Sequence, residues 1–412
     1  MAAAGEELID SRYAAWRLLV TLALTTLGSA CMYVVAVVLP EVQAEFGVAR
    51  AQASLPYTWM MLGFGLGGLF MGRWADRSGV HVPLLLGAGA IGLGFFASAQ
   101  ASNILQFTLA HGLLLGLFGA SSAFAPLLAD TALWWRRRRG IAVAVCASGN
   151  YVAGALWPPL VQRGIELWGW RTTYLVLALV CSLGMASLSL MMRRRPPLVA
   201  NEAPNSPKAL ASAAPFGLRP GQAQALLSVA GVACCVAMAM PQVHIVAYCS
   251  DLGFGAARGA EMLSIMLGFG VVSRLLSGAI CDRIGGLKTL LLGSILQGCA
   301  LLLFLPFDGL RSLYVISALF GLFQGGIVPS YAIIVREHFP ASEAGTRVGT
   351  VIFATLVGMA LGGWLSGKIF DLTGSYHAAF INGVAWNLLN LSIASTLLLR
   401  DRKQRHADAH PA

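Results

Sequence analysis

One arginine interrupts an otherwise apolar stretch of this sequence. Arg274 lies between about 259 and 281, where the other residues are apolar or small apart from Glu261 near the start. A charge at the centre of a membrane helix costs roughly 2.5–3.5 kcal/mol, so such a residue normally faces water or a counter-charge. The guanidinium fork suits a carboxylate in a bidentate pair. Arg274 therefore predicts contact with a carboxylate substrate; the alternative is a structural pair with backbone carbonyls or a distant acid.

Other polar residues also lie within apolar stretches. His111 and His244 titrate near neutral pH, so together with Arg274 they are candidates for proton coupling; a hydrogen bond to a neighbouring helix is the other interpretation of each histidine. After Arg274, the residues that we predict to contact substrate are Tyr33, Asn150, His244 and Tyr331. Asn150 equally suits a hydrogen bond between helices.

The sequence offers little for metal or covalent chemistry. Its eight cysteines fall in or beside apolar segments, and no Cys-x-x-Cys pair or Cys/His cluster is present. No combination of nucleophile and base is visible either. We expect no enzymatic activity, no metal site and no cofactor, and we interpret the cysteines as packing residues.

The composition indicates that lipid is the solvent for much of the chain. Apolar residues make up 57% and charged residues 11%, against about 25% charged residues in soluble domains. Apolar stretches of about 20 residues, the length of a membrane-spanning helix, recur along the chain. We predict twelve, at 16–39, 53–72, 82–101, 103–128, 140–162, 172–192, 223–247, 259–281, 288–306, 311–335, 347–370 and 377–399.

A repeated motif divides the chain in half. Gly72-x-x-x-Asp76-Arg77-x-Gly79 recurs 206 positions later as Gly278-x-x-x-Asp282-Arg283-x-Gly285, and the chain has 412 residues. Repetition of this kind indicates a duplicated membrane protein. We predict an all-α membrane protein with two pseudo-symmetric six-helix bundles. The expected boundaries are 1–192 for the first bundle, 193–221 for a cytoplasmic linker, 222–400 for the second bundle and 401–412 for a basic, disordered cytoplasmic tail.

The basic residues predict the orientation. If both termini are cytoplasmic, that side carries 21 of the 28 lysines and arginines and the outer side carries 6. The run Arg136–Arg139 then marks a cytoplasmic loop, and the net charge of +10 needs no nucleic-acid partner. We expect a multi-pass protein of the cell (inner) membrane without a cleavable signal peptide, functioning as a monomer.

Paired glycines lie in the second and eleventh predicted helices. Gly63-x-x-x-Gly67 and Gly358-x-x-x-Gly362 allow close helix approach. We interpret these two helices as sliding partners, with static packing as the alternative.

The chain resembles the major facilitator superfamily over its whole length, through its twelve helices, its linker and the repeated Gly-x-x-x-Asp-Arg-x-Gly motif. Further motifs are similar to the monocarboxylate transporter and oxalate/formate antiporter branch. These are Trp134–Ala142, Ala147–Asn150, Pro158-Pro159, Gly169–Arg171, His244–Gly253 and Ser273–Leu275.

The resemblance implies a cytoplasmic gate. Asp76, Arg77, Asp282 and Arg283 would belong to a latch that holds the halves together in the outward-open state. Asp130 would pair with Arg77 or the Arg136–Arg139 run; a role of these arginines in topology alone is the alternative.

The resemblance also implies that Arg274 binds the substrate carboxylate. Animal members of the branch carry an aspartate where this chain has Gly270 and a lysine where it has Tyr33, so their proton-coupling mechanism does not carry over directly. We therefore expect proton-coupled symport of a small monocarboxylate, similar to lactate or pyruvate, by alternating access.

Two other transport functions remain open. Exchange of organic anions of the oxalate/formate type is the first, although Lys368 lies shallower than the lysine of the oxalate exchangers. Multidrug efflux is less favoured, since the fifth helix has Pro158-Pro159 in place of a Gly-Pro antiporter signature.

Overall fold

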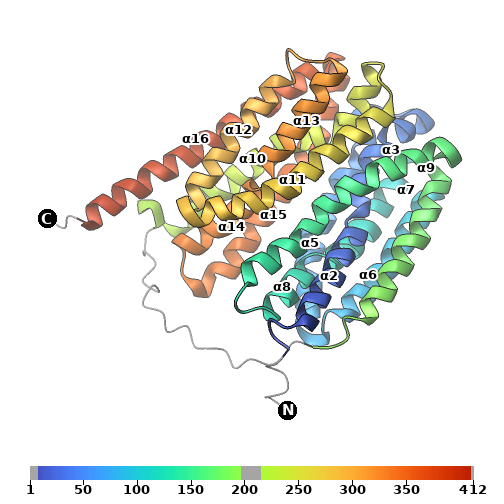
Figure 1. The fold of residues 1–412 in the computed structure, drawn as a ribbon. Coiled ribbons are helices and arrows are strands. Elements are labelled where there is room, and N and C mark those ends of the chain that lie inside the picture. Colours follow the sequence, from blue (N-terminus) through green and yellow to red (C-terminus); the bar gives the residue numbers. More distant parts are fainter. Residues whose placement is uncertain (1–7, 196–214, 410–412) are drawn as a thin grey trace. The chain divides into compact units, whose positions relative to one another are not determined.

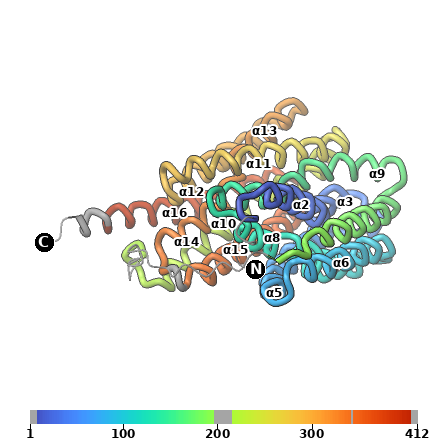
Figure 2. Tube along the Cα trace, turned by 60° about the horizontal axis from the view of Figure 1, so that its bottom comes forward, coloured from blue at the N-terminus to red at the C-terminus, as the bar shows by residue number. Residues whose placement is uncertain are grey.

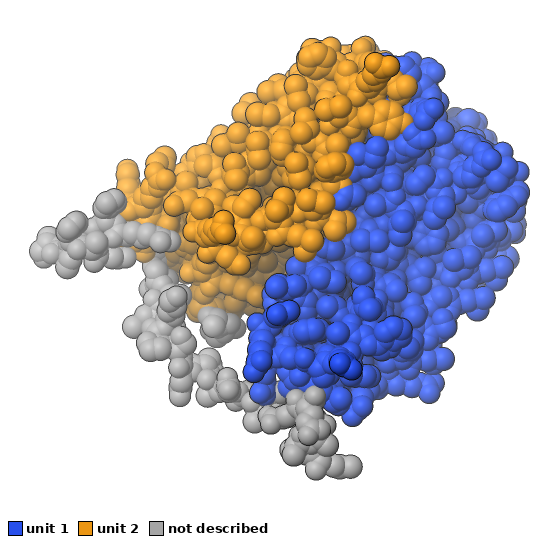
Figure 3. All heavy atoms as spheres, viewed as in Figure 1, with its two compact units in different colours: residues 1–201, 242–268 blue, residues 202–241, 269–412 orange. Residues whose placement is uncertain are grey.

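The computed structural model describes residues 8–195 and 215–409, and within these ranges the chain forms helices and no strands. It divides into two compact units (Figure 3). Unit 1 combines Met1–Asn201 with Gln242–Gly268, and unit 2 combines Glu202–Pro241 with Phe269–Ala412. The boundaries of the two six-helix bundles stay a prediction, and most of the predicted linker lies outside the described residues.

The helices within residues 8–195, whose course Figure 1 shows, all belong to unit 1. In chain order they are α2 (Arg12–Gly28), α3 (Ala30–Phe46), α4 (Arg50–Ala53), α5 (Leu55–Ser78), α6 (His81–Ala99), α7 (Ile104–Leu109), the π-helix η1 (Ala110–Ala120), α8 (Ala125–Leu133) and α9 (Arg139–Leu190). The long helix α9 packs against α2, α3 and α6.

Two helices within residues 215–409 are shared between the units, since α10 (Pro220–Asp251) and α11 (Ala256–Ile284) each contribute to both. The remaining elements belong to unit 2. They are the short 3-10 helix η3 (Pro215–Gly217), α12 (Gly286–Leu303), α13 (Leu310–Gln324), α14 (Ile327–His338), α15 (Ala341–Thr373) and α16 (Tyr376–Ala409). In this unit α12 packs against α13, α14 and α16.

Each of the twelve predicted stretches falls on one helix or on consecutive helices. Among the described residues, ten helical segments are long and apolar enough to span a membrane. One of them, Arg139–Leu190, covers the fifth and sixth predicted stretches together. The second stretch lies on α5, which is not among the ten. The all-helical membrane fold is therefore confirmed.

A single glycine separates the fifth and sixth stretches. Gly169 has φ 76° and ψ 161° inside α9, a conformation that residues with a Cβ atom rarely adopt. The chain therefore reverses there, and Trp170 and Arg171 follow at the start of the second arm of α9.

The paired glycines make close contacts inside their own units, and the interpretation of their two helices as sliding partners stays a prediction. A Cβ atom at Gly63 would lie 2.2 Å from the Gly112 carbonyl oxygen, and one at Gly67 would lie 2.1 Å from that of Leu117. Both contacts are with η1. Gly358 and Gly362 meet α10 in the same way, at the carbonyl oxygens of Val232 and Val236. Small residues at these positions allow fixed backbone packing.

The last helix extends beyond the apolar stretch. α16 continues as far as Ala409, so the expected disorder of the tail is wrong for residues 401–409. These residues include Arg, Lys, Gln and Ala, which have good helix propensity and can prolong a helix that has already been nucleated.

Candidate substrate site and gate residues

Two residues predicted to contact substrate lie together in unit 1. The Tyr33 hydroxyl on α3 donates a hydrogen bond to the Asn150 side-chain oxygen on α9, and the Asn150 amide approaches Met32 Sδ at 3.6 Å. Tyr33 is 8% exposed. The pair offers a phenol and an amide within a membrane-spanning region, where both can form hydrogen bonds to a polar ligand.

The segment before Asn150 explains why these helices approach so closely. A Cβ atom at Gly149 would lie 1.8 Å from Thr25 Oγ1, so no larger residue fits. The Thr25 and Thr26 hydroxyls donate to the carbonyl oxygens of Cys146 and Gly149, at 3.2 and 3.3 Å. This part of the Ala147–Asn150 motif is thus the contact surface between the first and fifth membrane helices.

The proline pair of α9 creates a second contact. Proline has no N–H, so Pro159 cannot donate to the Ala155 carbonyl four residues earlier. The Ser264 hydroxyl of α11 donates to this carbonyl instead. Nearby, a Cβ atom at Gly154 would lie 2.2 Å from Leu267 Cδ1 and 3.0 Å from Tyr33 Cζ. In unit 1 the start of α11 therefore packs directly on α9 beside Tyr33.

His111 lies in a closed cluster within unit 1. Its Nδ1 atom is 2.9 Å from the Phe107 carbonyl oxygen and 3.3 Å from Ser98 Oγ, and its Nε2 atom is 3.3 Å from the Tyr174 hydroxyl. The imidazole is fully buried and close to the rings of Phe107 and Tyr174. Neither Tyr33 nor Asn150 is among these contacts of His111. The proton-coupling role of His111 stays a prediction. His244, on the part of α10 that belongs to unit 1, is also fully buried.

Arg274 lies on the part of α11 that belongs to unit 2. Its side chain is half-buried, whereas the neighbouring Ser273 is buried. A Cβ atom at Gly325 would lie 2.5 Å from the Gly270 carbonyl oxygen and 3.0 Å from the Arg274 amide nitrogen. The absence of a side chain at Gly325 lets the backbone around Arg274 pack closely, which fixes the point from which the guanidinium extends.

Tyr331 takes part in a polar network inside unit 2. Its hydroxyl donates to Asn390 Oδ1 at 2.8 Å, and the Asn390 amide donates to Ser294 Oγ at 2.7 Å. One turn away, the Asn387 amide donates to Gln297 Oε1 at 3.3 Å. The network joins α12, α14 and α16, and Tyr331 is fully buried within it. Its predicted contact with substrate is untested.

The predicted gate residues are found at the helix ends. Asp76 and Arg77 lie in the last turn of α5, Asp282 and Arg283 lie in the last turn of α11, and all four are exposed. The motif glycines that follow, Gly79 and Gly285, have φ values of 82° and 84°, which accounts for glycine at the end of each copy.

Asp130 has a different partner from the two that were expected. Its carboxylate accepts hydrogen bonds from Arg17 Nε at 3.1 Å and Arg17 Nη2 at 2.9 Å. Both side chains are 3% exposed, and the Arg17 guanidinium lies 4.6 Å from the Trp134 ring centroid. Arg17 was not among the predicted partners of Asp130, so the sequence analysis missed this buried pair.

A second ion pair unites distant parts of unit 1. Arg50 on α4 reaches Asp251 at the end of α10, with Nη1–Oδ2 and Nη2–Oδ1 distances of 3.1 and 3.2 Å. The Arg50 side chain is 9% exposed. Two-point pairing of this kind fixes the relative orientation of the planar groups.

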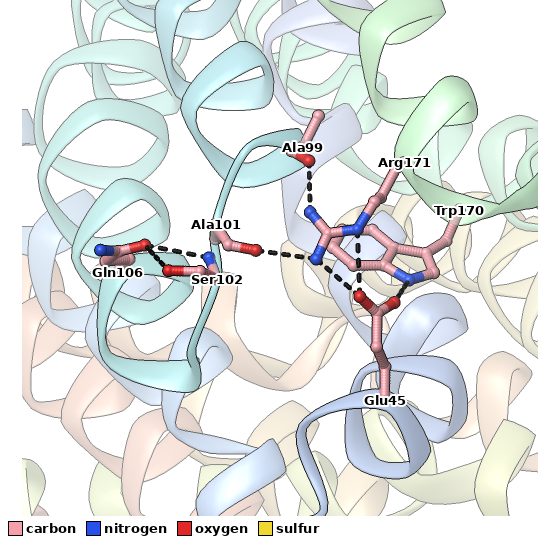
Figure 4. Close-up of polar contacts among 7 residues, drawn as sticks. All are labelled: Glu45, Ala99, Ala101, Ser102, Gln106, Trp170 and Arg171. Carbon is pink, nitrogen blue, oxygen red and sulfur yellow. Dashed lines mark hydrogen bonds and ion pairs between the residues drawn. The ribbon is translucent and has the colours of Figure 1, made fainter.

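The Gly169–Arg171 motif has a structural explanation (Figure 4). The Glu45 carboxylate accepts from the Trp170 indole N–H and, at 2.6 Å, from Arg171 Nη2. Arg171 also donates to the carbonyl oxygens of Ala99 and Ala101, at 2.5 and 2.8 Å. One guanidinium thus ties α9 to the end of α3 and to the turn after α6. The motif itself was the sequence signal, but Glu45 was missed.

We expect Arg171→Gln to lower the apparent melting temperature of the purified protein by several degrees, because an amide cannot bond Glu45 and both carbonyls together. Thermal unfolding in detergent measures this. Arg163→Gln is the matched control, since Arg163 is 70% exposed and pairs with Glu166 on its own helix. Equal melting temperatures of the two variants would contradict the prediction.

The cysteines and histidines form no metal site in the part of the chain that the structure describes. Seven of the eight cysteines are buried, and Cys299 on α12 is exposed. This agrees with their expected role in packing.

Comparisons with known proteins extend these observations. The family model described as Major Facilitator Superfamily matches residues 21–312 and 262–411. Monocarboxylate transporter 13 of Rattus norvegicus is 28% identical over 324 residues, covering 76% of this chain and 73% of the relative. The MFS-type transporter opdF of Penicillium oxalicum is 24% identical over 327 residues, covering 79% and 75%.

Solved structures support the fold. A bacterial homologue of the human lysosomal transporter Spinster, in an inward-facing and occupied conformation, superimposes with a TM-score of 0.71 at 15% identity. The match covers 95% of this chain and 97% of that one. The predicted fold and the resemblance to the monocarboxylate branch are confirmed. The chain belongs to the Major Facilitator Superfamily and is a multi-pass membrane transporter rather than an enzyme.

Proposed function

We propose that this transporter carries a small monocarboxylate together with a proton across the cell membrane, by alternating access. The observation that carries the proposal is the half-buried Arg274 on a membrane-spanning segment of α11. An intramembrane arginine is costly unless its charge is used, and a carboxylate matches its geometry. The similarity to a monocarboxylate transporter agrees with this substrate class.

Coupling to a proton makes the transport cycle electroneutral. A monoanion that moves with one proton carries no net charge, so its accumulation depends on the pH gradient, and each pH unit corresponds to about 1.4 kcal/mol. Arg274, His244 and His111 remain the proposed proton-coupling residues. We also infer a cell (inner) membrane location with both termini in the cytoplasm, and function as a monomer.

The exposed motif residues fit a transport cycle. Four charged residues of the motif are exposed at the ends of α5 and α11, namely Asp76, Arg77, Asp282 and Arg283. Because they are exposed, their side chains can form and release contacts without the cost of desolvating a charge. We propose that they form the cytoplasmic gate and that the buried Asp130 supports it through Arg17.

Uptake into proteoliposomes tests the function. The purified protein is reconstituted, and labelled lactate, pyruvate, formate and oxalate are offered with and without an inside-alkaline pH gradient. Symport predicts lactate or pyruvate accumulation that rises about tenfold per pH unit at equilibrium. Uptake only with an internal counter-anion would support exchange instead. Transport of cationic drugs without transport of any acid would overturn the proposal in favour of efflux.

A conservative variant tests whether the Tyr33–Asn150 pair contacts the substrate. We expect Tyr33→Phe to raise the KM for the monocarboxylate by about tenfold, because it removes one hydrogen-bond donor worth about 1.5 kcal/mol or more to a charged ligand. Concentration-dependent uptake measures the change. Tyr13→Phe is the matched control, since the contacts of Tyr13 with Trp134 and Arg194 are made by its ring, which phenylalanine keeps. An unchanged KM in Tyr33→Phe would remove Tyr33 from the site.

A further inference from the structure

Two runs of arginine lie at one end of unit 1. Arg136–Arg139 connect α8 to α9, Arg193–Arg195 follow α9, and all seven side chains are exposed. We call these seven residues the basic rim. Seven positive charges at one end of the unit create a strong local attraction for anions.

The beginning of the described chain brings the two runs together. The Asp10 amide donates to the Trp134 carbonyl oxygen at 3.2 Å, and the Tyr13 and Trp134 rings lie 5.4 Å apart. On the other side, the Arg194 guanidinium lies 5.5 Å from the Tyr13 ring centroid. The start of α2 therefore adjoins both runs, and Figure 2 shows it beside α8.

Asp10 fixes the backbone of the first run. Its carboxylate accepts from the Arg136 amide at 3.3 Å and from the Arg137 amide at 3.2 Å. Asp10 itself has φ 55°, a conformation that aspartate tolerates better than most residues. In these bonds the Asp10 carboxylate accepts from backbone amides and not from arginine side chains. Within residues 8–195 and 215–409, Arg137, Arg138 and Arg193 form no ion pair, so their positive charge is not neutralised by a side chain there.

Exposed apolar side chains border the basic rim. Leu133 at the end of α8 is 52% exposed, Ile141 near the start of α9 is 63% exposed, and Met191 just after α9 is 44% exposed. On a membrane helix such side chains face acyl chains, and arginines one or two turns beyond them reach the headgroups. Tyr13, which is half-buried at the start of α2, provides an aromatic residue of the kind that is typical of this boundary.

We propose that the basic rim is a binding site for the headgroups of anionic phospholipids in the adjoining leaflet. Guanidinium groups bind phosphate oxygens in two-point pairs, and basic clusters beside membrane helices attract acidic lipids. The apolar border favours a lipid over a free anion, because a lipid supplies a phosphate and acyl chains at once. The site is independent of which substrate the protein carries.

Lipid-dependent stability tests the proposal. The purified full chain is mixed with phosphatidylglycerol, phosphatidylcholine or inorganic phosphate, and its melting temperature is measured. Phosphatidylglycerol should raise the melting temperature by several degrees, and the other two should not. An equal effect of phosphatidylcholine would show that the charge is irrelevant, and an equal effect of inorganic phosphate would show a free-anion site; either result overturns the proposal.

Variants locate the effect. Replacing Arg137, Arg138 and Arg193 by glutamine should weaken phosphatidylglycerol binding by roughly two orders of magnitude, at about a factor of five for each arginine. The matched control is glutamine at Arg400, Arg402 and Lys403 on α16, which removes the same charge elsewhere. Retention of full lipid stabilisation in the first variant would overturn the proposal.

The wild-type protein gives a second test that needs no variant. A photoactivatable phosphatidylglycerol should label peptides that contain residues 133–141 or 191–195. Labelling confined to other peptides would overturn the proposal even if the glutamine variant failed to fold.

Discussion

Arg274→Gln should reduce uptake of the monocarboxylate at least about 100-fold in kcat/KM. The glutamine amide is neutral and replaces a two-point ionic contact by at most one neutral hydrogen bond. Hydrogen bonds to charged groups contribute about 1.5–3 kcal/mol each, and about 2.8 kcal/mol corresponds to 100-fold. Initial rates of uptake into proteoliposomes, normalised to the amount of inserted protein, measure the effect.

Two companion variants make this result specific. Arg274→Lys keeps the charge but not the fork, so it should retain a small part of the activity. Arg258→Gln, at the exposed start of the same helix, removes an arginine that pairs with Glu261 at 3.0 Å, and it should transport normally. Uptake at the wild-type rate in Arg274→Gln would refute the carboxylate site, whatever the other variants do.

Breaking the Arg17–Asp130 pair should destabilise the protein by about 3–5 kcal/mol. Both side chains are 3% exposed, and removing one partner leaves the other charge buried without compensation. Asp130→Asn preserves the shape of the side chain and removes its charge, and it is therefore the most direct single variant. Chemical unfolding in detergent micelles, followed by tryptophan fluorescence, measures the loss.

The double variant separates charge from packing. Arg17→Met with Asp130→Leu fills a similar volume without any buried charge, so it should recover most of the lost stability. Trp134, which lies against Arg17, can pack against the methionine. If Asp130→Asn alone were as stable as the wild type, the pair would not contribute to folding as described.

The lengths of the apolar stretches were sufficient to predict the membrane helices, because the thickness of the bilayer fixes the length of a spanning helix. The repeated motif located equivalent helix ends in the two halves, and each copy does end a helix at a glycine with positive φ. Helix boundaries inside a continuous run were harder to predict. The fifth and sixth stretches meet at Gly169, where one residue reverses the chain.

Contacts between helices were harder to predict from the sequence, because the length of an apolar stretch does not determine which faces of two helices meet. Tyr33 and Asn150 were both predicted to contact substrate, but their hydrogen bond to each other required the packing of Gly149 on Thr25. Asp130 was assigned to Arg77 or the Arg136–Arg139 run because of its position along the chain. The rotation of α2 brings Arg17 to it instead.

The same limit applies to the histidines and glycines. His111 has the chemistry of a proton carrier, yet the surroundings that its side chain meets, Ser98, Tyr174 and the Phe107 carbonyl, come from distant positions. Gly63 and Gly67 allow a close helix contact, and only the structure shows that the partner is η1. The depth of a side chain in the membrane can be predicted from a sequence more readily than the residues that this side chain contacts.

The hydrogen bond from Ser264 on α11 to the Ala155 carbonyl oxygen on α9 has a consequence for how these two helices can separate. Their separation requires that this oxygen be hydrated. If the start of α11 moved away from α9, Ser264 could donate to a carbonyl of its own helix, as serines in membrane helices do. The Ala155 carbonyl has no such substitute, because Pro159 has no N–H to offer it. In an apolar membrane interior this oxygen then requires water. Because of the proline pair, α11 and α9 can separate at this point only if a water molecule enters to hydrogen-bond the Ala155 carbonyl oxygen. Separation without water is disfavoured.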